Sequence, residues 1–322
     1  MYTTTIKGTG SYVPDNKVPN STMETLVDTS DEWIKTRTGI EFRHIAVHEN
    51  TSDLAYEAAI KAMDDAGIKA EALDMIIVAT VSGDYVFPGV SQLLQKRLGC
   101  NAIPAFDLNA ACTGFVYALD LANGMIASGK YENILIIGAE ALSKLTDFKD
   151  RNTCVLFGDG AGAFVLSRSS EAGVRSVITH SDGDAAGYLK LEGYPVKKNY
   201  ETEQRELPFI KMDGTEIFKF ATSVFPSVIK ELLDDAELTL ENLDLIVAHQ
   251  ANKRIIDKSA KVLGYPKEKM YMNIARYGNT SAASIPIAVD EAIKHGKLKR
   301  GDTFAIAAFG GGLTWGGAII DY

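Results

Sequence analysis

Apolar and polar positions along the chain follow two alternating patterns, and the alternation predicts helices interleaved with strands. Helical periodicity runs over residues 52–67, where a Ser/Asp start and a glycine stop mark the two ends. The continuous apolar runs that predict strands lie at 74–80, 103–108 and 133–138. Further helices are predicted over 90–98 and from Cys112 to Gly129. Because strands that are apolar throughout are typical of a sheet covered on both faces, the pattern indicates an α/β fold.

The second half of the chain repeats the plan of the first. The segment Leu73–Ala79 is echoed at Leu243–Ala248, an offset of 170 (243 − 73). The helix ends at Gly129 and Gly296 also correspond, with an offset of 167 (296 − 129). Repetition at about half the chain length predicts two fused, similar βα halves that share one core.

We place the two predicted halves at residues 1–172 and 173–322, within one compact unit. If the offset of 167 holds throughout, Cys112 and Asn279 occupy equivalent positions in the two halves, because 279 − 112 is also 167. Both residues are then expected at helix starts that face the pseudo-twofold axis between the halves.

Three segments depart from the alternation. Pro226 stands inside the helical run 217–233, which predicts a kink or two shorter helices. The polar stretch 181–212 is expected to be a surface excursion. The uncharged, glycine-containing stretch 304–320 is better read as two buried strands joined by a glycine turn than as a membrane span.

Composition limits the classes of function. The 322 residues are 46% hydrophobic and carry a net charge of −9, which argues against a nucleic-acid partner and against an anionic membrane surface. The three cysteines have no regular spacing, and the N-terminus shows no basic segment followed by an apolar one. We therefore expect a soluble cytoplasmic protein, without a metal site.

Candidate chemistry begins with Cys112, which follows an apolar strand and opens an alanine- and glycine-containing helix. A helix start offers free backbone N–H groups and positive potential, and both favour a thiolate. His249 and Asn279 stand at similar junctions further along the chain. The pattern predicts covalent sulfur chemistry at Cys112.

Simpler interpretations compete at each of these positions. A cysteine in apolar surroundings is often inert core, an interpretation that we favour for Cys100 and Cys154. A histidine is often structural, and Asn279 beside a glycine is compatible with a turn. The run Phe157–Gly162 is similar to a phosphate loop but lacks its Gly-Lys-Ser/Thr ending, so a tight turn between strands is the better interpretation.

Four segments in a fixed order carry a family resemblance: Cys112–Gly114, His249–Asn252, Gly278–Ser284 and Ala308–Gly317. Together they resemble the β-ketoacyl-acyl carrier protein synthase III family of the thiolase superfamily, over essentially the whole chain. The resemblance implies a thiolase-like fold, in which two duplicated βα halves form a five-layered αβαβα core, and a homodimer. It also implies that the protein initiates fatty acid synthesis by decarboxylative condensation of a short acyl-CoA with malonyl-acyl carrier protein.

The resemblance also assigns roles to residues. Cys112 would form the acyl-enzyme, while His249 and Asn279 would donate hydrogen bonds to the malonyl thioester oxygen as it becomes an enolate. The backbone N–H groups of Cys112 and Gly311 would form the oxyanion hole. The substrates would be CoA and phosphopantetheine thioesters, with no separate cofactor.

Binding residues follow from the same resemblance. The residues expected to bind CoA are Trp33, Arg37, Arg151 and Asn252. The residues expected to bind the acidic carrier protein are Lys219, Arg254, Lys258 and Lys261, the last three forming a basic stripe at i, i+4 and i+7. Phe87 and Phe309 are expected to line the acyl pocket, with Phe87 reaching across the dimer.

Three other functions compete with this interpretation. The chain order Cys, His, Asn is also that of papain-like cysteine proteases, whose Cys-Gly-Ser-Cys-Trp signature is absent. A related condensing or acyl-transfer enzyme of secondary metabolism would share the fold. An acyl-binding scaffold without turnover is disfavoured by the intact Cys112, His249 and Asn279.

Overall fold

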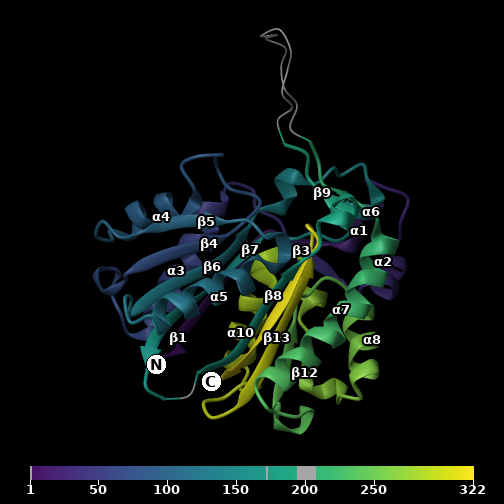
Figure 1. The fold of residues 1–322 in the computed structure, drawn as a ribbon. Coiled ribbons are helices and arrows are strands. Elements are labelled where there is room, and N and C mark those ends of the chain that lie inside the picture. The colour runs from purple at the N-terminus through teal and green to yellow at the C-terminus, as the bar shows by residue number, and fades with distance from the viewer. Residues whose placement is uncertain (1, 172, 194–207) are drawn as a thin grey trace.

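In the computed structural model, which describes residues 2–171, 173–193 and 208–322, two five-stranded sheets of matching topology form the frame (Figure 1). Strands of the first sheet are, in order across it, β1 (Thr3–Tyr12), β7 (Gly160–Ser169), β6 (Asn133–Glu140), β4 (Met75–Ala79) and β5 (Ala105–Leu108). Those of the second are β8 (Val174–Ser181), β14 (Thr314–Asp321), β13 (Thr303–Gly310), β11 (Leu245–Ala248) and β12 (Met270–Tyr271). In each sheet the last three strands are parallel and the first two pair antiparallel.

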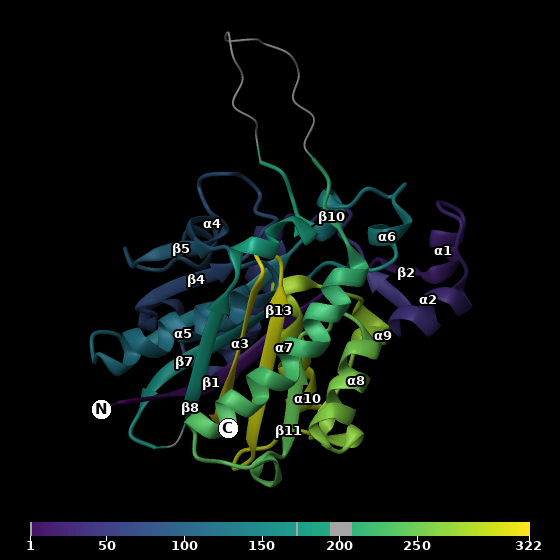
Figure 2. The same ribbon diagram turned by 45° about the vertical axis from the view of Figure 1, so that its right-hand side comes forward.

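Helices cover both sheets and fill the space between them. The inner layer consists of α5 (Gly114–Ala127) and α10 (Ser284–Lys294), whose apolar side chains pack with those of both sheets in one core. The outer layers are α3 (Thr51–Ala66) with α4 (Val90–Leu98) on the first sheet, and α7 (Gly214–Asp235) with α8 (Lys253–Leu263) on the second (Figure 2). These elements form the five layers α, β, α, β, α that the resemblance implies.

Short elements gather at one end of the layers. They are β2 (Lys17–Pro19), α1 (Asn20–Glu24), α2 (Asp31–Thr38), β3 (Phe42–His44), α6 (Arg151–Cys154), β9 (Leu189–Lys190), β10 (Lys211–Met212) and α9 (Ile274–Tyr277). The chain ends lie toward the opposite end of the molecule in both views (Figure 1, Figure 2). Together, the short elements build the surroundings of the site described below.

Local sequence explains why α3 lies so close to its sheet. The helix begins with a capping box between Asn50 and Asp53, and its buried face is mostly alanine. Gly10 of β1 faces this helix, where a Cβ atom would lie 2.4 Å from the backbone nitrogen of Ala62. Glycine on the strand and alanine on the helix thus allow a backbone contact that larger side chains would prevent.

The two halves correspond with an offset of 170 at their helix starts. The 3₁₀ turns η2 (Ala111–Thr113) and η7 (Ser281–Ala283) precede α5 and α10, and both open on a residue with positive φ, 46° for Ala111 and 50° for Ser281. The predicted equivalence of Cys112 and Asn279 is therefore wrong: Cys112 corresponds to Ala282 (282 − 112 = 170).

The offset of 167 belongs to the helix ends, because α5 has 14 residues and α10 has 11. The predicted boundary between 172 and 173 falls between β7 and β8, and the division into two halves there remains an interpretation.

Of two further predictions from the pattern, the one for the helix around Pro226 is partly wrong and the one for residues 304–320 is confirmed. The helical run around Pro226 is one helix, α7, so the alternative of two shorter helices is wrong. Its buried face, which includes Phe225 and Leu232, packs against the second sheet, and this burial maintains the helix through the proline. The stretch 304–320 forms the antiparallel pair β13 and β14, as predicted.

The segment 181–212 is described only in part. Its charged run, 197–206, lies outside the described residues. The described ends pair as β9 and β10 and contribute Leu189 and Ile210 to the wall of a cavity, so they are more than a surface excursion. Among the helices that the structure describes, none has both the length and the apolar character needed to cross a membrane.

Candidate active site

Cys112 lies in the turn that connects β5 to α5. The Asn109 side chain accepts a hydrogen bond from the Ala111 N–H (3.2 Å), and the chain then enters η2 and α5. Cys112 is 8% exposed and stands just before the 14-residue helix α5, so positive helix potential is directed toward the sulfur. Gly310 packs directly against it, since a Cβ atom there would lie 2.8 Å from the Cys112 Cβ.

Asn279 stands in the equivalent turn of the second half. Its side-chain oxygen accepts a hydrogen bond from the Ser281 N–H (2.9 Å), so its amide NH₂ is left as the donor. Its backbone is held on both sides, because the Asn279 N–H donates to Leu156 O (2.9 Å) and its carbonyl accepts from Gly158 N–H (3.0 Å). The side-chain amide of Asn279 is thereby fixed just before the N-terminus of α10.

The run Phe157–Gly162 supports this turn and is not a phosphate loop. It connects α6 to β7, rather than two strands as predicted, and Phe157 pairs with Asn279 in a parallel bridge. The Asp159 carboxylate accepts hydrogen bonds from Ala46 N–H (2.8 Å) and from the Ser143 hydroxyl (2.6 Å). A buried carboxylate at the centre of the run would repel a phosphate.

His249 follows β11 and is almost completely buried. Its Nδ1 lies 2.7 Å from the Ser284 hydroxyl, which also accepts the Gln250 N–H (3.3 Å). When that hydroxyl donates its own hydrogen to Nδ1, the proton of the neutral His249 is on Nε2. Burial lowers the pKa of His249 to about 3, so the imidazole is neutral.

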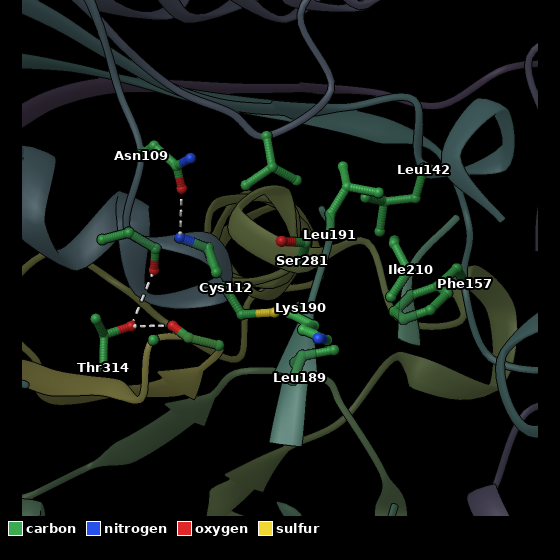
Figure 3. A pocket seen from close by; sticks show the side chains of 15 residues that line it. Asn109, Cys112, Leu142, Phe157, Leu189, Lys190, Leu191, Ile210, Ser281 and Thr314 are labelled. Carbon is green, nitrogen blue, oxygen red and sulfur yellow. Dashed lines mark hydrogen bonds between the residues drawn. The ribbon is translucent and has the colours of Figure 1, made fainter. Parts of the chain in front are cut away.

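Two cavities meet at Cys112. A channel of about 590 Å³ is lined by Cys112, His249 and Asn279 at its inner end and by Trp33 and Arg37 further out. A second, largely apolar pocket of about 470 Å³ lies beyond the sulfur, with Leu142, Phe157 and Ile210 in its wall (Figure 3). Residues that line both cavities are Cys112, Phe157 and Leu189. Three side chains distant in sequence thus converge where a channel opens into an apolar pocket.

The ionisation state of Cys112 differs from the sequence-based expectation. Burial raises the pKa of the thiol to about 11, and the carboxylate of Glu140 acts in the same direction. The Ser281 side chain and the Cys112 N–H oppose this rise. Desolvation outweighs the helix start, so the sulfur of the free site is a thiol.

The residues expected to bind CoA surround the outer channel. The Arg151 guanidinium stacks on the Trp33 ring at 4.3 Å, which leaves no space for a base between them. Asn252 caps α8 by accepting the Arg254 N–H (2.9 Å), and its amide donates to the Arg37 carbonyl (3.0 Å). Asn252 therefore joins α8 to α2 at the rim of the channel.

The basic stripe lies on the exposed face of α8. In the described part of the chain, Arg254, Lys258 and Lys261 form no ion pair with a carboxylate, and Lys219 of α7 pairs with Glu216 (2.6 Å). The Phe218 ring lies beneath Arg254 (5.2 Å) and Lys258 (5.5 Å). Arg254, at one end of the stripe, also lines the channel that leads to Cys112.

Phe309, one of the two phenylalanines expected in the acyl pocket, lies outside it. Phe309 lines the channel, with its ring 5.4 Å from His249, and is not among the residues that line the pocket beyond Cys112. Successive side chains of β13 point to opposite faces, which places Phe309 on the side of α7, next to Phe225 (6.4 Å). Phe87 is 85% exposed and does not line the pocket of its own chain. Gly311 does line that pocket, beside Cys112.

Three residues of the site escaped the sequence-based prediction: Ser281, Ser284 and Glu140. Both serines belong to the segment Gly278–Ser284 that attracted attention only for its asparagine. Glu140 ends a buried, mostly apolar strand. A single charged residue in such a strand is unusual, and this could have identified Glu140 as a candidate from the sequence. Among the described residues, no cluster of three or more His, Cys, Asp or Glu side chains is arranged to hold a metal ion.

Comparison with known proteins places these features in a family. Residues 106–183 match the family model described as 3-oxoacyl-[acyl-carrier-protein] synthase III, and residues 233–322 match its C-terminal model. A β-ketoacyl-[acyl-carrier-protein] synthase III of Clostridium perfringens is 50% identical over 316 residues, covering 97% of both chains. The crystal structure of 3-oxoacyl-[acyl-carrier-protein] synthase III from Aquifex aeolicus has a TM-score of 0.94 at 46% identity, covering 99% of this chain and 100% of that one. The priming β-ketosynthase of the R1128 polyketide pathway has a TM-score of 0.90 at 32% identity, covering 99% and 96%.

Proposed function

The chain belongs to the β-ketoacyl-[acyl-carrier-protein] synthase III family, and from this premise we propose that Cys112, His249 and Asn279 carry its condensing reaction. The enzyme is an acyltransferase with the thiolase-like fold, and it initiates fatty acid synthesis from a short acyl-CoA and malonyl-acyl carrier protein. The observation that carries the proposal is the convergence of the three side chains where the channel meets the apolar pocket.

In the first half-reaction the Cys112 sulfur attacks the acyl-CoA carbonyl, the bond from that carbon to the CoA sulfur breaks, and the acyl group remains on Cys112. The pocket of about 470 Å³ accommodates the acyl chain, since its wall is largely apolar. The backbone N–H groups of Cys112 and Gly311 stabilise the oxyanion. Gly310 allows this close approach, because any side chain there would collide with Cys112.

In the second half-reaction malonyl-acyl carrier protein loses CO₂, and the resulting carbanion attacks the acyl-enzyme. Negative charge develops on the malonyl thioester oxygen, where the Nε2–H of His249 and the amide NH₂ of Asn279 donate hydrogen bonds. A neutral imidazole suits this task, because it donates without being a competing acid. Losing one such fixed donor typically costs about 10²–10³-fold in rate.

CoA binding uses the outer channel. The Trp33 ring and the Arg151 guanidinium separate to admit the adenine between them, and base stacking on an aromatic ring is worth about 1–3 kcal/mol. Arg37 offers a cation to the CoA phosphates, while Asn252 holds its backbone in place.

The carrier protein docks on the basic stripe of α8. Arg254, Lys258 and Lys261, together with Lys219, which lines the same channel as Arg254, present positive charge to an acidic partner on an otherwise acidic protein. Electrostatic complementarity of this kind mainly raises the association rate.

The enzyme acts as a homodimer in which Phe87 of one protomer closes the acyl pocket of its partner. The supporting observation is a run of exposed apolar side chains, with Tyr85 63%, Val86 79% and Phe87 85% exposed. Apolar surface of this extent is unusual on a monomer and indicates an interface.

Mass spectrometry of the protein incubated with a series of acyl-CoA thioesters tests the proposal. We expect one acyl adduct on Cys112, discharged by malonyl-acyl carrier protein with formation of the β-ketoacyl product. The Cys112→Ala variant should form no adduct. An adduct that persists in this variant, or one that malonyl-acyl carrier protein does not discharge, contradicts the proposed roles. Product formation only with a carrier from a specialised pathway would favour the secondary-metabolism alternative.

A further inference from the structure

A buried carboxyl group lies behind the nucleophile and has no part in the condensation described above. Glu140 ends β6 with its side chain completely enclosed. Its carboxylate accepts hydrogen bonds from the Ser82 hydroxyl (2.5 Å), the Val81 N–H (3.2 Å) and the Thr80 hydroxyl (3.3 Å). The Ser281 side chain also acts on this carboxyl group and lowers its pKa.

Ser281 connects this carboxyl group to Cys112. Its side chain lowers the pKa of both groups and lines the same pocket as the sulfur (Figure 3). The duplicated architecture explains the placement: β6 packs on η7 as β13 packs on η2. With the offset of 170, Glu140 corresponds to Gly310, the residue that touches Cys112 from the other sheet.

The first half-reaction needs an acceptor for the thiol proton. Neutral His249 is a weak base in its buried setting, and its Nδ1 is occupied by Ser284. Burial raises the pKa of Glu140 to about 7, while its hydrogen bonds act in the opposite direction, so the carboxyl group exchanges a proton near neutral pH. The ionisable groups that interact with Glu140 are Cys112 from η2 and Lys144 from the turn after β6. Thr80, Ser82 and Ser281, from the other elements packed against it, are uncharged.

We propose that Ser281 and Glu140 form a proton relay that activates Cys112 for attack on the acyl thioester. This inference rests on the proposed function, because it assigns the proton of its first step. As the Cys112 sulfur bonds to the thioester carbon, its proton passes to the Ser281 oxygen and the Ser281 hydroxyl proton passes to the Glu140 carboxylate. The CoA sulfur leaves with the electron pair of the broken bond and takes a proton from water in the channel.

The relay runs backward in the second half-reaction. When the carbanion displaces Cys112 from the acyl carbon, the sulfur leaves as a thiolate and recovers its proton from Glu140 through Ser281. The cycle therefore consumes one proton from water for each CO₂ released, and both side chains return to their starting states. In this scheme Ser281 contacts the reacting sulfur and is catalytic, whereas Glu140 acts through it and is a positioning residue.

Single-turnover acylation of Cys112 by acetyl-CoA, measured against pH by quenched-flow mass spectrometry, tests the relay. In the parent enzyme the acylation rate should rise through about pH 7, as Glu140 loses its proton, and then level off. Ser281→Ala and Glu140→Gln should each slow acylation at pH 7 by about 10²-fold, the lower end of the range for a general base. The double variant should be no slower than either single one, because both changes interrupt one path.

A matched variant separates the relay from a merely structural role. Ser82→Ala removes a hydrogen bond that lowers the pKa of Glu140 but lies outside the path to the sulfur. It should shift the rise in rate to higher pH and retain the plateau. Ser281→Ala is expected to fold, because Ala111 already occupies the equivalent position with the same positive φ.

Other outcomes overturn the relay and are distinguishable from failure of the proposed function. If Glu140 only repels the thiolate, Glu140→Gln should acylate as fast as the parent at pH 7 or faster. Additive losses in the double variant, or an unchanged pH profile in Ser281→Ala, also contradict a shared path. In all these cases Cys112 still receives the acyl group. An adduct on another residue would instead refute the proposed function.

Discussion

The hydrogen bond from Ser284 to His249 has a measurable consequence for the second half-reaction. Ser284→Ala removes the hydroxyl that lies 2.7 Å from Nδ1 and accepts the Gln250 N–H. In the proposed mechanism this contact keeps the imidazole proton on Nε2, where the enolate needs a donor, and the variant loses it. A hydrogen bond of this kind contributes about 0.5–1.5 kcal/mol, which corresponds to a fall in condensation rate of about 2- to 13-fold.

The same change should leave the first half-reaction intact, because in the proposed mechanism His249 donates only to the malonyl thioester. Acyl-enzyme formation from acetyl-CoA should therefore keep its parent rate, while turnover with malonyl-acyl carrier protein falls. The free energy of unfolding should drop by about 1–3 kcal/mol, since the buried Gln250 N–H loses its acceptor. Rapid-quench measurements of the two half-reactions and urea unfolding test both expectations.

Ser259 offers a matched control. It is also completely buried, but its hydroxyl has no hydrogen-bond partner within the described residues, so Ser259→Ala should preserve both half-reactions and stability. Equal losses in the two half-reactions of Ser284→Ala would show that the hydroxyl supports the whole site rather than one tautomer. A condensation rate equal to that of the parent would refute the argument altogether.

Three further predictions concern other parts of the site. Gly310→Ala should abolish acylation, because its Cβ would lie 2.8 Å from that of Cys112, whereas Gly124→Ala, where nothing lies within 4 Å, should leave acylation unchanged; equal activity of the two variants would contradict this packing argument. Arg254→Glu should raise KM for malonyl-acyl carrier protein by about tenfold and spare acyl-CoA loading, in steady-state assays with each substrate varied; an equal effect on both would exclude a carrier-specific role. Phe87→Thr should shift the preference from acetyl-CoA toward longer or branched primers, and competition assays that show an unchanged preference would reject a role in the acyl pocket.

The sequence predicted the layers better than the details of the site. Continuous apolar strands and glycine stops are local signals, so β4, β13 and α3 lie where the pattern indicated. The equivalence of Cys112 with Asn279 failed because an offset measured at the helix ends was applied to the helix starts. The difference of three residues lies within the inner helices, and no local pattern shows where along a helix a repeat loses residues.

Electrostatics and side-chain direction depend on contacts between distant segments. The thiolate expected at Cys112 followed from its helix start, which is a local feature, whereas the rise in its pKa comes from burial beneath both sheets. Phe309 was expected beside the acyl chain, yet the alternation of β13 directs it toward α7 and His249. Neither the burial of a group nor the direction of a side chain can be inferred from sequence spacing alone.

The duplication explains why the equivalent strand ends of the two halves bear different residues, Glu140 in the first half and Gly310 in the second. Both helix starts share an Asx-type hydrogen bond, from Ala111 N–H to Asn109 and from Ser281 N–H to Asn279, and both face the end of the central strand of a sheet. In the first half the turn supplies the nucleophile, so the strand end that packs on it must be glycine. In the second half the same turn supplies Asn279 and a serine, so the opposing strand end has room for the carboxyl group of Glu140. The two strand ends thus approach Cys112 from opposite sheets. Gly310 gives close backbone contact, and Glu140 is the proton acceptor of the proposed relay. Exchanging Glu140 for glycine should remove the acceptor without disturbing the contact at Gly310.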